Sequence, residues 1–367
     1  MYRRVAGVGL ALTMLVAGCG HSSSTSQGPA TSSTPVPSVA TSSTRAASAT
    51  SQAARDLPDP HTLRGLTEVP ELPDPKPVEG SSAQKLPVTV TDVEGNKVTI
   101  KSTSRILALD LYGTLSRTLI GLGLGDKIVG RTVSSTEKQL HDRPVVTENG
   151  HVLNVEAVAG LKPSVIIADR SVGPKEALDQ LRKSGIPVVL VDPHRSVGST
   201  PQLIRTIADA VGKPDAGEAL VKRTQEQIDQ AKKQIAAWKP AKPMRVAFLY
   251  VRGSAGVFFI LGSENGANEL IQGVGADDVA SDKGITTLVP ANAESLVSIN
   301  PDAIFVMRDG LASTGGMKGL LARAGVANTT AGRKQRVISI PDGISLSFGP
   351  QTGEVLTAVA KALYGVK

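Results

Sequence analysis

The stretch that decides the fold reads Val146-Thr-Glu-Asn-Gly-His151-Val-Leu-Asn154-Val-Glu156-Ala-Val-Ala-Gly-Leu-Lys-Pro163-Ser-Val-Ile-Ile-Ala-Asp169. His151 follows an Asn-Gly turn, and Asn154 is a good N-cap for a short helix that carries Glu156 in its first turn. Lys-Pro then leads into a short apolar run that is typical of a buried strand. We therefore expect a candidate metal ligand and an exposed carboxylate a few residues apart on one loop-helix unit.

The second half of the chain repeats this pattern in Ala293-Glu294-Ser-Leu-Val-Ser-Ile-Asn-Pro301-Asp-Ala-Ile-Phe-Val. In both copies a Glu lies seven residues before a Pro, with a short helical pattern between them and a strand pattern afterwards. Either Glu alone could simply favour its helix N-terminus through the helix dipole, an effect of about 0.5 kcal/mol. The repetition indicates that the two halves of the chain echo each other.

Short apolar strands alternate with helical patterns in both halves. A β-hairpin is expected first, at 88–100, where two alternating runs flank a Gly-containing turn. The expected strands lie at 105–109, 127–131, 165–168, 187–191, 245–251, 303–307 and 336–340, and the expected helices at 113–122, 155–160, 174–184, 265–272, 293–299, 319–324 and 351–364. Strands that are apolar on both faces and separated by helices predict an α/β fold with mostly parallel sheets.

One long helical pattern, at 214–238, interrupts this alternation. Its apolar residues recur at steps of three and four among charged and amide residues, and Lys239-Pro240 ends the pattern. At 1.5 Å per residue the helix would be roughly 37 Å long, too long for one crossover helix among its neighbours. A coiled-coil arm is the alternative, but the stripe lacks sustained heptads. We therefore expect an N-terminal α/β lobe at 86–213, a linking helix at 214–239 and a C-terminal α/β lobe at 240–367.

The first 85 residues are expected to export and tether these lobes. Arg3-Arg4 precedes an apolar run that is too short to span a bilayer, and Val16-Ala17-Gly18-Cys19 resembles a bacterial lipobox, in which the Cys is lipidated. We expect a lipoprotein signal peptide at 1–18 and anchoring to the cell membrane through Cys19; an ordinary signal with an incidental Cys is the alternative. Residues 19–85 are rich in Ser, Thr, Ala and Pro and are expected to form a flexible tether.

Charge and cysteine content exclude several classes of protein. The formal net charge is +7, or +5 once Arg3 and Arg4 leave with the signal, and no basic run with interleaved aromatics is present, so nucleic-acid binding is not expected. Cys19 is the only cysteine, which excludes an intrachain disulfide. The glycine run at 121–125 has the wrong order of elements for a dinucleotide loop, and 343–347 lacks the final Gly of a nucleophile elbow. No Cys/His cluster suggests zinc.

With this duplicated Glu pattern, the chain resembles the ABC-importer substrate-binding proteins for haem, siderophores and vitamin B12. Leu86-Pro-Val-Thr-Val-Thr-Asp92, the run Leu122-Gly-Leu-Gly-Asp-Lys-Ile-Val-Gly-Arg131 and the long helix support the resemblance, which covers 86–367 but not the tether. It implies a class III periplasmic-binding-protein fold, in which two rigid lobes joined by one long helix close slightly on a ligand in the cleft. It also implies that Glu156 and Glu294, one on each lobe, dock on Arg residues of an ABC permease.

Within this family, His151 and Tyr250 resemble the iron ligands of haem-binding lipoproteins of the HmuT type. The resemblance implies that haem iron is held between a His of the N-terminal lobe and a Tyr of the C-terminal lobe, with an Arg near the phenol two residues later, here Arg252. Imidazole is a borderline nitrogen ligand, and phenolate is a hard anionic oxygen donor suited to ferric iron. Filling both axial positions leaves no open site for peroxide or oxygen, which favours transport over catalysis.

We therefore expect a membrane-anchored, extracytoplasmic protein that binds ferric haem b and delivers it to an ABC permease, not an enzyme, with a surface haem-donor protein as a further partner. Without the resemblance, His151 would be interpreted as a solvent-exposed side chain and Tyr250 as an aromatic at the edge of the core. A ferric-siderophore binder of the same fold and, less directly, a haem enzyme are the alternatives. The other histidines are expected at the surface: His21, His61, His141 and His194. Core packing is expected for five further residues that could also approach a porphyrin: Phe258, Phe259, Met307, Phe348 and Tyr364.

Overall fold

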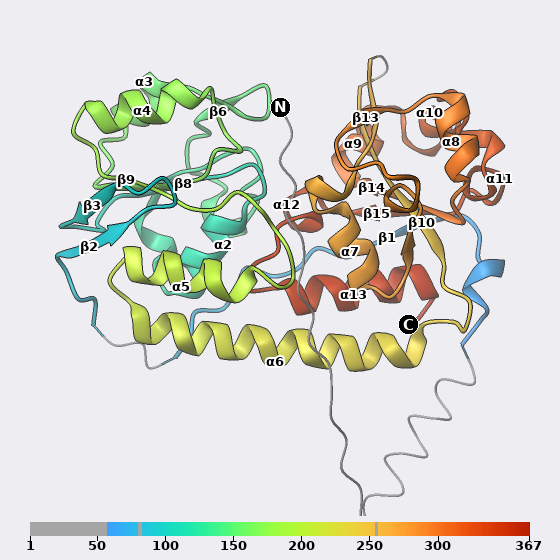
Figure 1. The fold of residues 1–367 in the computed structure, drawn as a ribbon, viewed down its shortest axis with the longest axis horizontal. Helices are drawn as coiled ribbons and strands as arrows, with labels where there is room; N and C mark the ends of the chain where they lie inside the picture. The colour runs from blue at the N-terminus through green and yellow to red at the C-terminus, as the bar shows by residue number, and fades with distance from the viewer. Residues whose placement is uncertain (1–56, 80–82, 254–255) are drawn as a thin grey trace, which may run out of the picture. The chain divides into compact units, whose positions relative to one another are not determined.

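The computed structural model describes residues 57–79, 83–253 and 256–367, which belong to one compact unit. Figure 1 shows two α/β lobes side by side above one long helix, α6 (Pro214–Trp238). The N-terminal lobe, drawn mostly in green, lies on the left of this view, and the C-terminal lobe, drawn in orange and red, lies on the right. This is the α/β architecture that the sequence predicts.

The N-terminal lobe, as far as it is described, is built on a four-stranded parallel sheet with the order β5-β4-β8-β9. Its strands are β4 (Ile106–Leu109), β5 (Ile128–Gly130), β8 (Val165–Ala168) and β9 (Val188–Leu190), and its helices are α2 (Thr114–Gly121), α3 (Val155–Gly160), α4 (Lys175–Lys183) and α5 (Thr200–Ala210). Every residue of β4, β8 and β9 is buried, as expected for parallel strands packed between helices. Two antiparallel pairs accompany the sheet: β2 (Val88–Thr91) with β3 (Lys97–Ile100), and β6 (Thr147–Glu148) with β7 (Val152–Leu153).

The described part of the C-terminal lobe is built on a seven-stranded mixed sheet with the order β1-β15-β14-β10-β11-β13, where β1 is Leu66–Glu68, and with β12 beside β10. Its strands from residue 245 onwards are β10 (Arg245–Arg252), β11 (Val257–Ile260), β12 (Asp277–Asp278), β13 (Val289–Pro290), β14 (Ala303–Met307) and β15 (Val337–Ile340). Its helices are α7 (Ala267–Gly273), α8 (Ala293–Ile299), α9 (Arg308–Ser313), α10 (Gly316–Leu321), α11 (Thr330–Lys334), α12 (Asp342–Ser345) and α13 (Thr352–Tyr364). Because β10, β14 and β15 run parallel, their carboxyl ends meet at one edge of the sheet.

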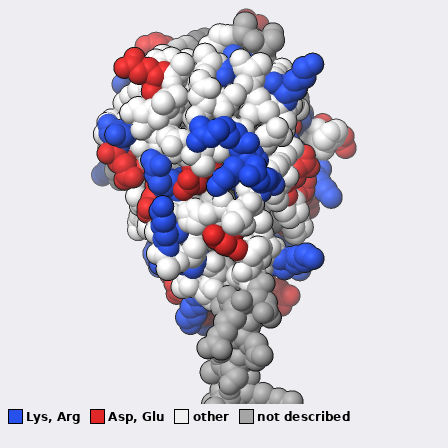
Figure 2. Space-filling model, turned by 90° about the vertical axis from the view of Figure 1, so that its right-hand side faces the viewer, with Lys and Arg blue, Asp and Glu red and all other residues white. Residues whose placement is uncertain are grey.

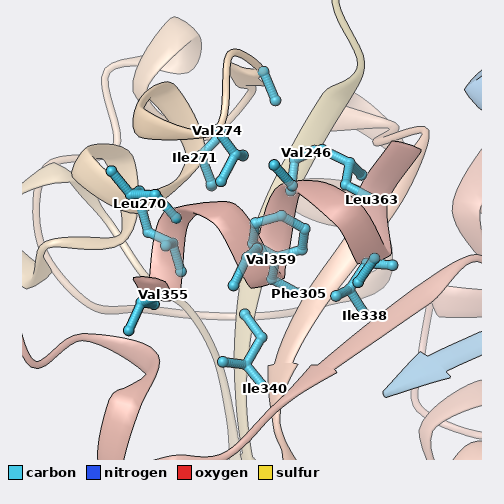
Figure 3. Close-up of a cluster of buried hydrophobic side chains, with 14 of the residues drawn as sticks. Val246, Leu270, Ile271, Val274, Phe305, Ile338, Ile340, Val355, Val359 and Leu363 are labelled. Carbon is cyan, nitrogen blue, oxygen red and sulfur yellow. The ribbon is translucent and has the colours of Figure 1, made fainter. Parts of the chain in front are cut away.

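An apolar core holds the C-terminal lobe together between this sheet and helices α7 and α13 (Figure 3). Val246, Phe305 and Ile338 contribute from three neighbouring strands, and Val359 and Leu363 contribute from α13. Burying a side chain of this size contributes roughly 1.5–3 kcal/mol. The core therefore fixes the strand ends that carry the residues discussed below.

The long helix ties the two lobes together. Its apolar residues Leu220, Ile228 and Ile235 are buried, and the helix packs against α5 of the N-terminal lobe and α13 of the C-terminal lobe. The prediction of a helix at 214–238 is confirmed. Within the described ranges, no helix is long and apolar enough to cross a membrane.

The structure corrects part of the expected tether at 19–85. Residues 66–68 form β1 (Leu66–Glu68), which pairs in parallel with β15 and extends the sheet of the C-terminal lobe. Val69, which follows β1, is fully buried. The prediction was wrong here because composition reports apolar side chains, whereas this segment is stabilised mainly by backbone pairing with an existing sheet.

The Pro-rich segment after β1 is also held by α6 and by the N-terminal lobe. Arg223 donates to the carbonyl of Lys76 at 2.6 Å, and the backbone N–H of Lys138 donates to Asp74 Oδ1 at 2.8 Å. These bonds explain why a segment with few apolar residues follows a defined path. The expected signal at 1–18 and the expected lipidation site Cys19 lie outside the described residues.

Sequence reasoning also missed α5. Leu203, Ile204 and Ile207 of this helix are buried, and the helix ends next to Gly212, which adopts a φ of 68°. The apolar pattern of α5 therefore ends only a few residues before the start of α6. In the second half, α10 begins at Gly316, three residues before the expected helix at 319–324.

Charged side chains of both signs mix on the surface of the C-terminal lobe. Figure 2 shows the side of the molecule where this lobe faces the viewer, with Lys and Arg gathered near the middle and Asp and Glu close beside them. One of the positively charged residues of this lobe stabilises a helix end. Arg245 donates to the carbonyls of Ile299 and Asn300 at the end of α8, at 2.7 and 2.9 Å.

Candidate functional site

A cleft of 640 Å³ lies between the two lobes. The N-terminal lobe lines it with residues that follow β4 and β5 and with the β6–β7 turn, and the C-terminal lobe lines it with the end of β10 and with residues of α9 and α12. A volume of this size suits a ligand of several hundred Å³. A second hollow, of 730 Å³, lies against α6 and α13 and contains none of the candidate ligand residues.

His151 lies in the turn between β6 and β7 and borders the cleft from the N-terminal lobe. Asn149 and Gly150 adopt positive φ angles of 49° and 89°, which this pair of residue types tolerates in a tight turn. The carbonyl of His151 accepts a hydrogen bond from the N–H of Gly173 at 2.9 Å. The backbone is therefore anchored, while the imidazole is exposed and its ring nitrogens have no hydrogen-bond partner among the described residues.

Tyr250 and Arg252 border the cleft from the C-terminal lobe, at the carboxyl end of β10. Because side chains alternate along a strand, residues two apart share a face. The guanidinium carbon of Arg252 lies 5.1 Å from the centre of the Tyr250 ring, within the range of a cation–π contact. The structure therefore brings His151, Tyr250 and Arg252 to one cleft.

Arg252 is fixed on its other side by Asp342, the first residue of α12. Nη2 of Arg252 donates to Oδ1 of Asp342 at 2.5 Å and to the sulfur of Met307 at 3.5 Å. Burial lowers the pKa of Arg252, but the charge and hydrogen bond of Asp342, helped by Tyr250, outweigh burial and raise this pKa above its usual value. The guanidinium is therefore a permanent positive charge beside the phenol.

Three large apolar side chains line the cleft and remain exposed. Leu111 is 37%, Val133 48% and Leu288 42% exposed. Two of them come from the N-terminal lobe and one from the C-terminal lobe. Exposed apolar side chains that converge on one hollow mark a surface that a ligand covers, so the cleft suits a ligand with apolar faces that touches both lobes.

A buried charged cluster supports the N-terminal wall of the cleft. Arg195 is hydrogen-bonded to Asp169, lies 3.8 Å from Asp110 and sits 5.6 Å from the ring centre of Tyr112, which lines the cleft. Burial, together with the charge of Asp169, raises the pKa of Asp110 to about 7. Burial also raises the pKa of Asp169, but its direct bond to Arg195 favours the ionised form, so Asp110 is the member of the pair that takes up a proton more readily.

Buried polar contacts join the lobes next to the cleft. Arg117 of α2 is 4% exposed and donates to the carbonyl of Gly343 at 3.2 Å and to Oε1 of Gln351 at 2.7 Å, both in the C-terminal lobe. Glu137 lies 3.5 Å from the same guanidinium and balances its charge. These contacts, together with α6, set the distance between the two walls of the cleft.

Glu156 and Glu294 lie outside the cleft, one on each lobe. Each is exposed and stands in the first turn of its helix, Glu156 in α3 and Glu294 in α8. Both helices are capped by an Asn side chain: Asn154 accepts from Ala157 N–H at 2.9 Å and Asn292 from Ser295 N–H at 2.8 Å. Figure 1 shows α3 and α8 at the same edge of the two lobes, away from α6.

The remaining candidate residues are mostly where the sequence predicts them. His141 and His194 are exposed outside the cleft, His61 bonds to the carbonyl of Lys242, and His21 lies outside the described residues. Phe258, Phe348 and Tyr364 are buried in the core of the C-terminal lobe. Met307 differs from the expectation, because it borders the cleft as well as packing on the core.

Sequence reasoning missed several residues of the cleft, among them Tyr112, Asp309 and Asp342. Each follows the carboxyl end of a parallel strand within a few residues: β4, β14 and β15. In open α/β sheets ligands bind at the carboxyl ends of the strands. That position was the signal that could have found these three residues.

The Periplasmic binding protein family matches residues 111–343 of the chain. Among solved structures, the heme binding protein HmuT is 49% identical, with a TM-score of 0.83 and with matches over 84% of this chain and 100% of its own. Three HmuT variants, in which one His, one Tyr or one Arg is replaced by alanine, give the same TM-score of 0.83.

More distant relatives include a second heme-binding protein and an ABC transporter substrate-binding lipoprotein. The periplasmic heme-binding protein RhuT from Roseiflexus sp. RS-1, in apo form, is 32% identical, with a TM-score of 0.67 and with matches over 72% of this chain and 99% of its own. The uncharacterized ABC transporter substrate-binding lipoprotein YvrC of Bacillus subtilis (strain 168) is 27% identical over 280 residues, which are 76% of this chain and 86% of YvrC.

Proposed function

Because the chain belongs to the periplasmic binding protein family, we propose that it is an extracytoplasmic haem-binding protein that delivers haem to an ABC permease for iron uptake. The observation that carries this proposal is the meeting of His151 and Tyr250, from different lobes, in one cleft. A haem that fills the cleft would present its iron to an imidazole on one side and to a phenol on the other.

The chemistry of the two ligands favours a ferric haem, which we propose to be haem b. Phenolate is an anionic oxygen donor that stabilises ferric iron, and imidazole completes the axial pair. Arg252, held 5.1 Å from the Tyr250 ring centre, supplies the positive charge that an iron-bound phenolate requires nearby. The solved HmuT variants change a His, a Tyr and an Arg, the same three residue types.

The rest of the cleft suits a porphyrin. Leu111 and Val133 of one lobe and Leu288 of the other offer exposed apolar surface to the two faces of a flat ring. With both axial positions filled, the iron would have no open site for oxygen or peroxide, so the protein would carry haem rather than use it as a catalyst.

We also propose how the protein docks on the permease and how it is anchored to the membrane. Glu156 and Glu294 would bind Arg residues of the permease, since both are exposed on capped helices at one edge of the lobes. Cys19 would carry the lipid that anchors the chain to the membrane, with the residues before the short 3-10 helix at Pro60–Thr62 as the tether.

Titration of the purified protein with hemin tests the proposal. We expect a saturable change of the Soret band that ends at one equivalent of hemin, and no change of that band on addition of peroxide. Indifference to hemin together with a retained ferric siderophore would favour the siderophore-binding alternative. A five-coordinate spectrum that reacts with peroxide would favour a haem enzyme.

A further inference from the structure

Asp342 stands behind Arg252 at the edge of the cleft. It follows β15 directly, and the parallel strands β10, β14 and β15 bring their carboxyl ends to one edge, which places Asp342 beside the end of β10. Its side chain is 17% exposed, against 32% for Arg252. The ion pair is thus shielded from solvent more than a surface pair would be.

The two carboxylate oxygens of Asp342 have different partners. Oδ1 accepts a hydrogen bond from Nη2 of Arg252 at 2.5 Å, and Oδ2 accepts one from the backbone N–H of Asp309 at 2.8 Å. A carboxylate can accept both bonds at once, whereas an amide has a single acceptor oxygen. Asp342 therefore connects the guanidinium of Arg252 to the backbone at the start of α9.

Gly310 restricts Arg252 from a second direction. A Cβ atom at position 310 would lie 2.7 Å from Nη1 of Arg252 and 2.5 Å from the carbonyl oxygen of Val251. Nη1 itself is buried and has no hydrogen-bond partner within the described residues. A buried donor without an acceptor is unfavourable, so this orientation of the guanidinium depends on the bond to Asp342.

We propose that Asp342 is a positioning residue for haem binding: it holds the guanidinium of Arg252 against Tyr250, so that the positive charge is already in place when Tyr250 binds iron. This inference rests on the proposed function, because it assumes that Tyr250 is an iron ligand. Without Asp342, Arg252 keeps its charge but loses its fixed orientation, and the iron-bound phenolate loses a neighbouring donor.

The test compares hemin dissociation and visible spectra among single and double variants. We expect Asp342→Ala to release hemin about tenfold faster than the wild type, the effect of losing one charge-assisted hydrogen bond, and to shift the visible bands in the same direction as Arg252→Ala. Asp342→Glu should restore part of the difference. Asp282→Asn is the matched control, because it changes an exposed carboxyl of the same lobe that does not line the cleft.

The double variant Arg252→Ala/Asp342→Ala separates positioning from general support. If Asp342 acts through Arg252, the double variant should release hemin at the rate of Arg252→Ala alone. Additive effects would instead mean that Asp342 only supports α9, and a wild-type rate in Asp342→Ala would equally overturn the inference. Should Asp342→Ala not fold, Asp342→Asn, which keeps one acceptor, serves in the same cycle. A wild-type protein that leaves the hemin spectrum unchanged would overturn the proposed function itself.

Discussion

His151 and Tyr250 belong to different lobes, yet both border the same 640 Å³ cleft. The distance between these two residues is set by other parts of the chain. Helix α6 packs on helices of both lobes, and Arg117 of α2 donates hydrogen bonds to Gly343 and Gln351 of the C-terminal lobe. A ligand bound by both residues would therefore meet a largely preformed site.

Replacing Tyr250 by Phe should weaken hemin binding by more than about tenfold, since even outer partners of metal ligands contribute about 10- to 100-fold. The variant keeps the ring beside Arg252 and removes only the oxygen. Equilibrium titration in the Soret region measures the change. Tyr112→Phe is the control, because Tyr112 lines the same cleft but is not a proposed ligand; equal losses in the two variants would contradict the assignment.

His151→Ala should change the spectrum of bound hemin while leaving the fold intact, because the imidazole is exposed and only the backbone of His151 is anchored. The visible spectrum of the ferric complex and the melting temperature of the haem-free protein measure the two effects. His194→Ala, which changes an exposed histidine paired with Asp192 outside the cleft, should match the wild type. An unchanged spectrum in His151→Ala would remove this residue from the iron.

Glu156→Ala and Glu294→Ala should each leave hemin affinity within about twofold of the wild type and reduce haem uptake by cells, with a greater loss when both are replaced. Each carboxylate is exposed and outside the cleft, so its removal disturbs no ligand contact. Growth on hemin as the iron source measures uptake. Glu176→Ala changes an exposed Glu in the first turn of α4 and should grow normally; loss of hemin affinity in Glu156→Ala would count against separate roles.

Asp110→Asn should make the stability of the haem-free protein depend less on pH between about 4 and about 7. Burial and the charge of Asp169 raise the pKa of Asp110 to about 7 in the folded protein, whereas the unfolded value is about 3.9. The folded state therefore binds the extra proton, and the stability that Asp110 contributes falls as pH rises from about 4 to about 7.

The Asp110→Asn variant removes the carboxyl group that titrates. Its amide keeps an oxygen that can accept the hydrogen bond from Thr114 N–H, which lies 2.9 Å from the Asp110 carboxylate in the wild type. Unfolding free energies at pH 5 and pH 8 measure the effect. We expect the decrease between the two values to be smaller in Asp110→Asn than in the wild type by about 2 kcal/mol. Parallel pH profiles would show that Asp110 is not the group that holds the proton.

The strands and helices that recur in both halves of the chain were predicted well, because buried parallel strands and capped helices produce local patterns in the sequence. The strand at β8, the helix at α8 and the long helix α6 were predicted at or within a residue of their bounds. The expected tether was partly wrong, since β1 is stabilised by pairing with β15 and its own composition gives no such signal.

In the candidate site, too, some residues were predicted from the sequence and others were not. Short local motifs and a family resemblance led to His151 and Tyr250, and the structure brings both to one cleft. Asp342, Arg195 and Arg117 were not found, because each acts through a partner that is distant in the sequence: Arg252, Asp169 and Gln351. Contacts of this kind depend on how strands are ordered in the sheets and how the lobes meet, which no short motif encodes.

The proposed function requires that one haem iron is coordinated by His151 and Tyr250 from opposite lobes. A crystal structure of the protein with bound hemin measures this directly. We expect one haem in the cleft, with an imidazole nitrogen of His151 and the phenol oxygen of Tyr250 both bonded to the iron, and with Arg252 still bonded to Asp342. Haem bound outside the cleft, or iron that is bonded to neither residue, would contradict it.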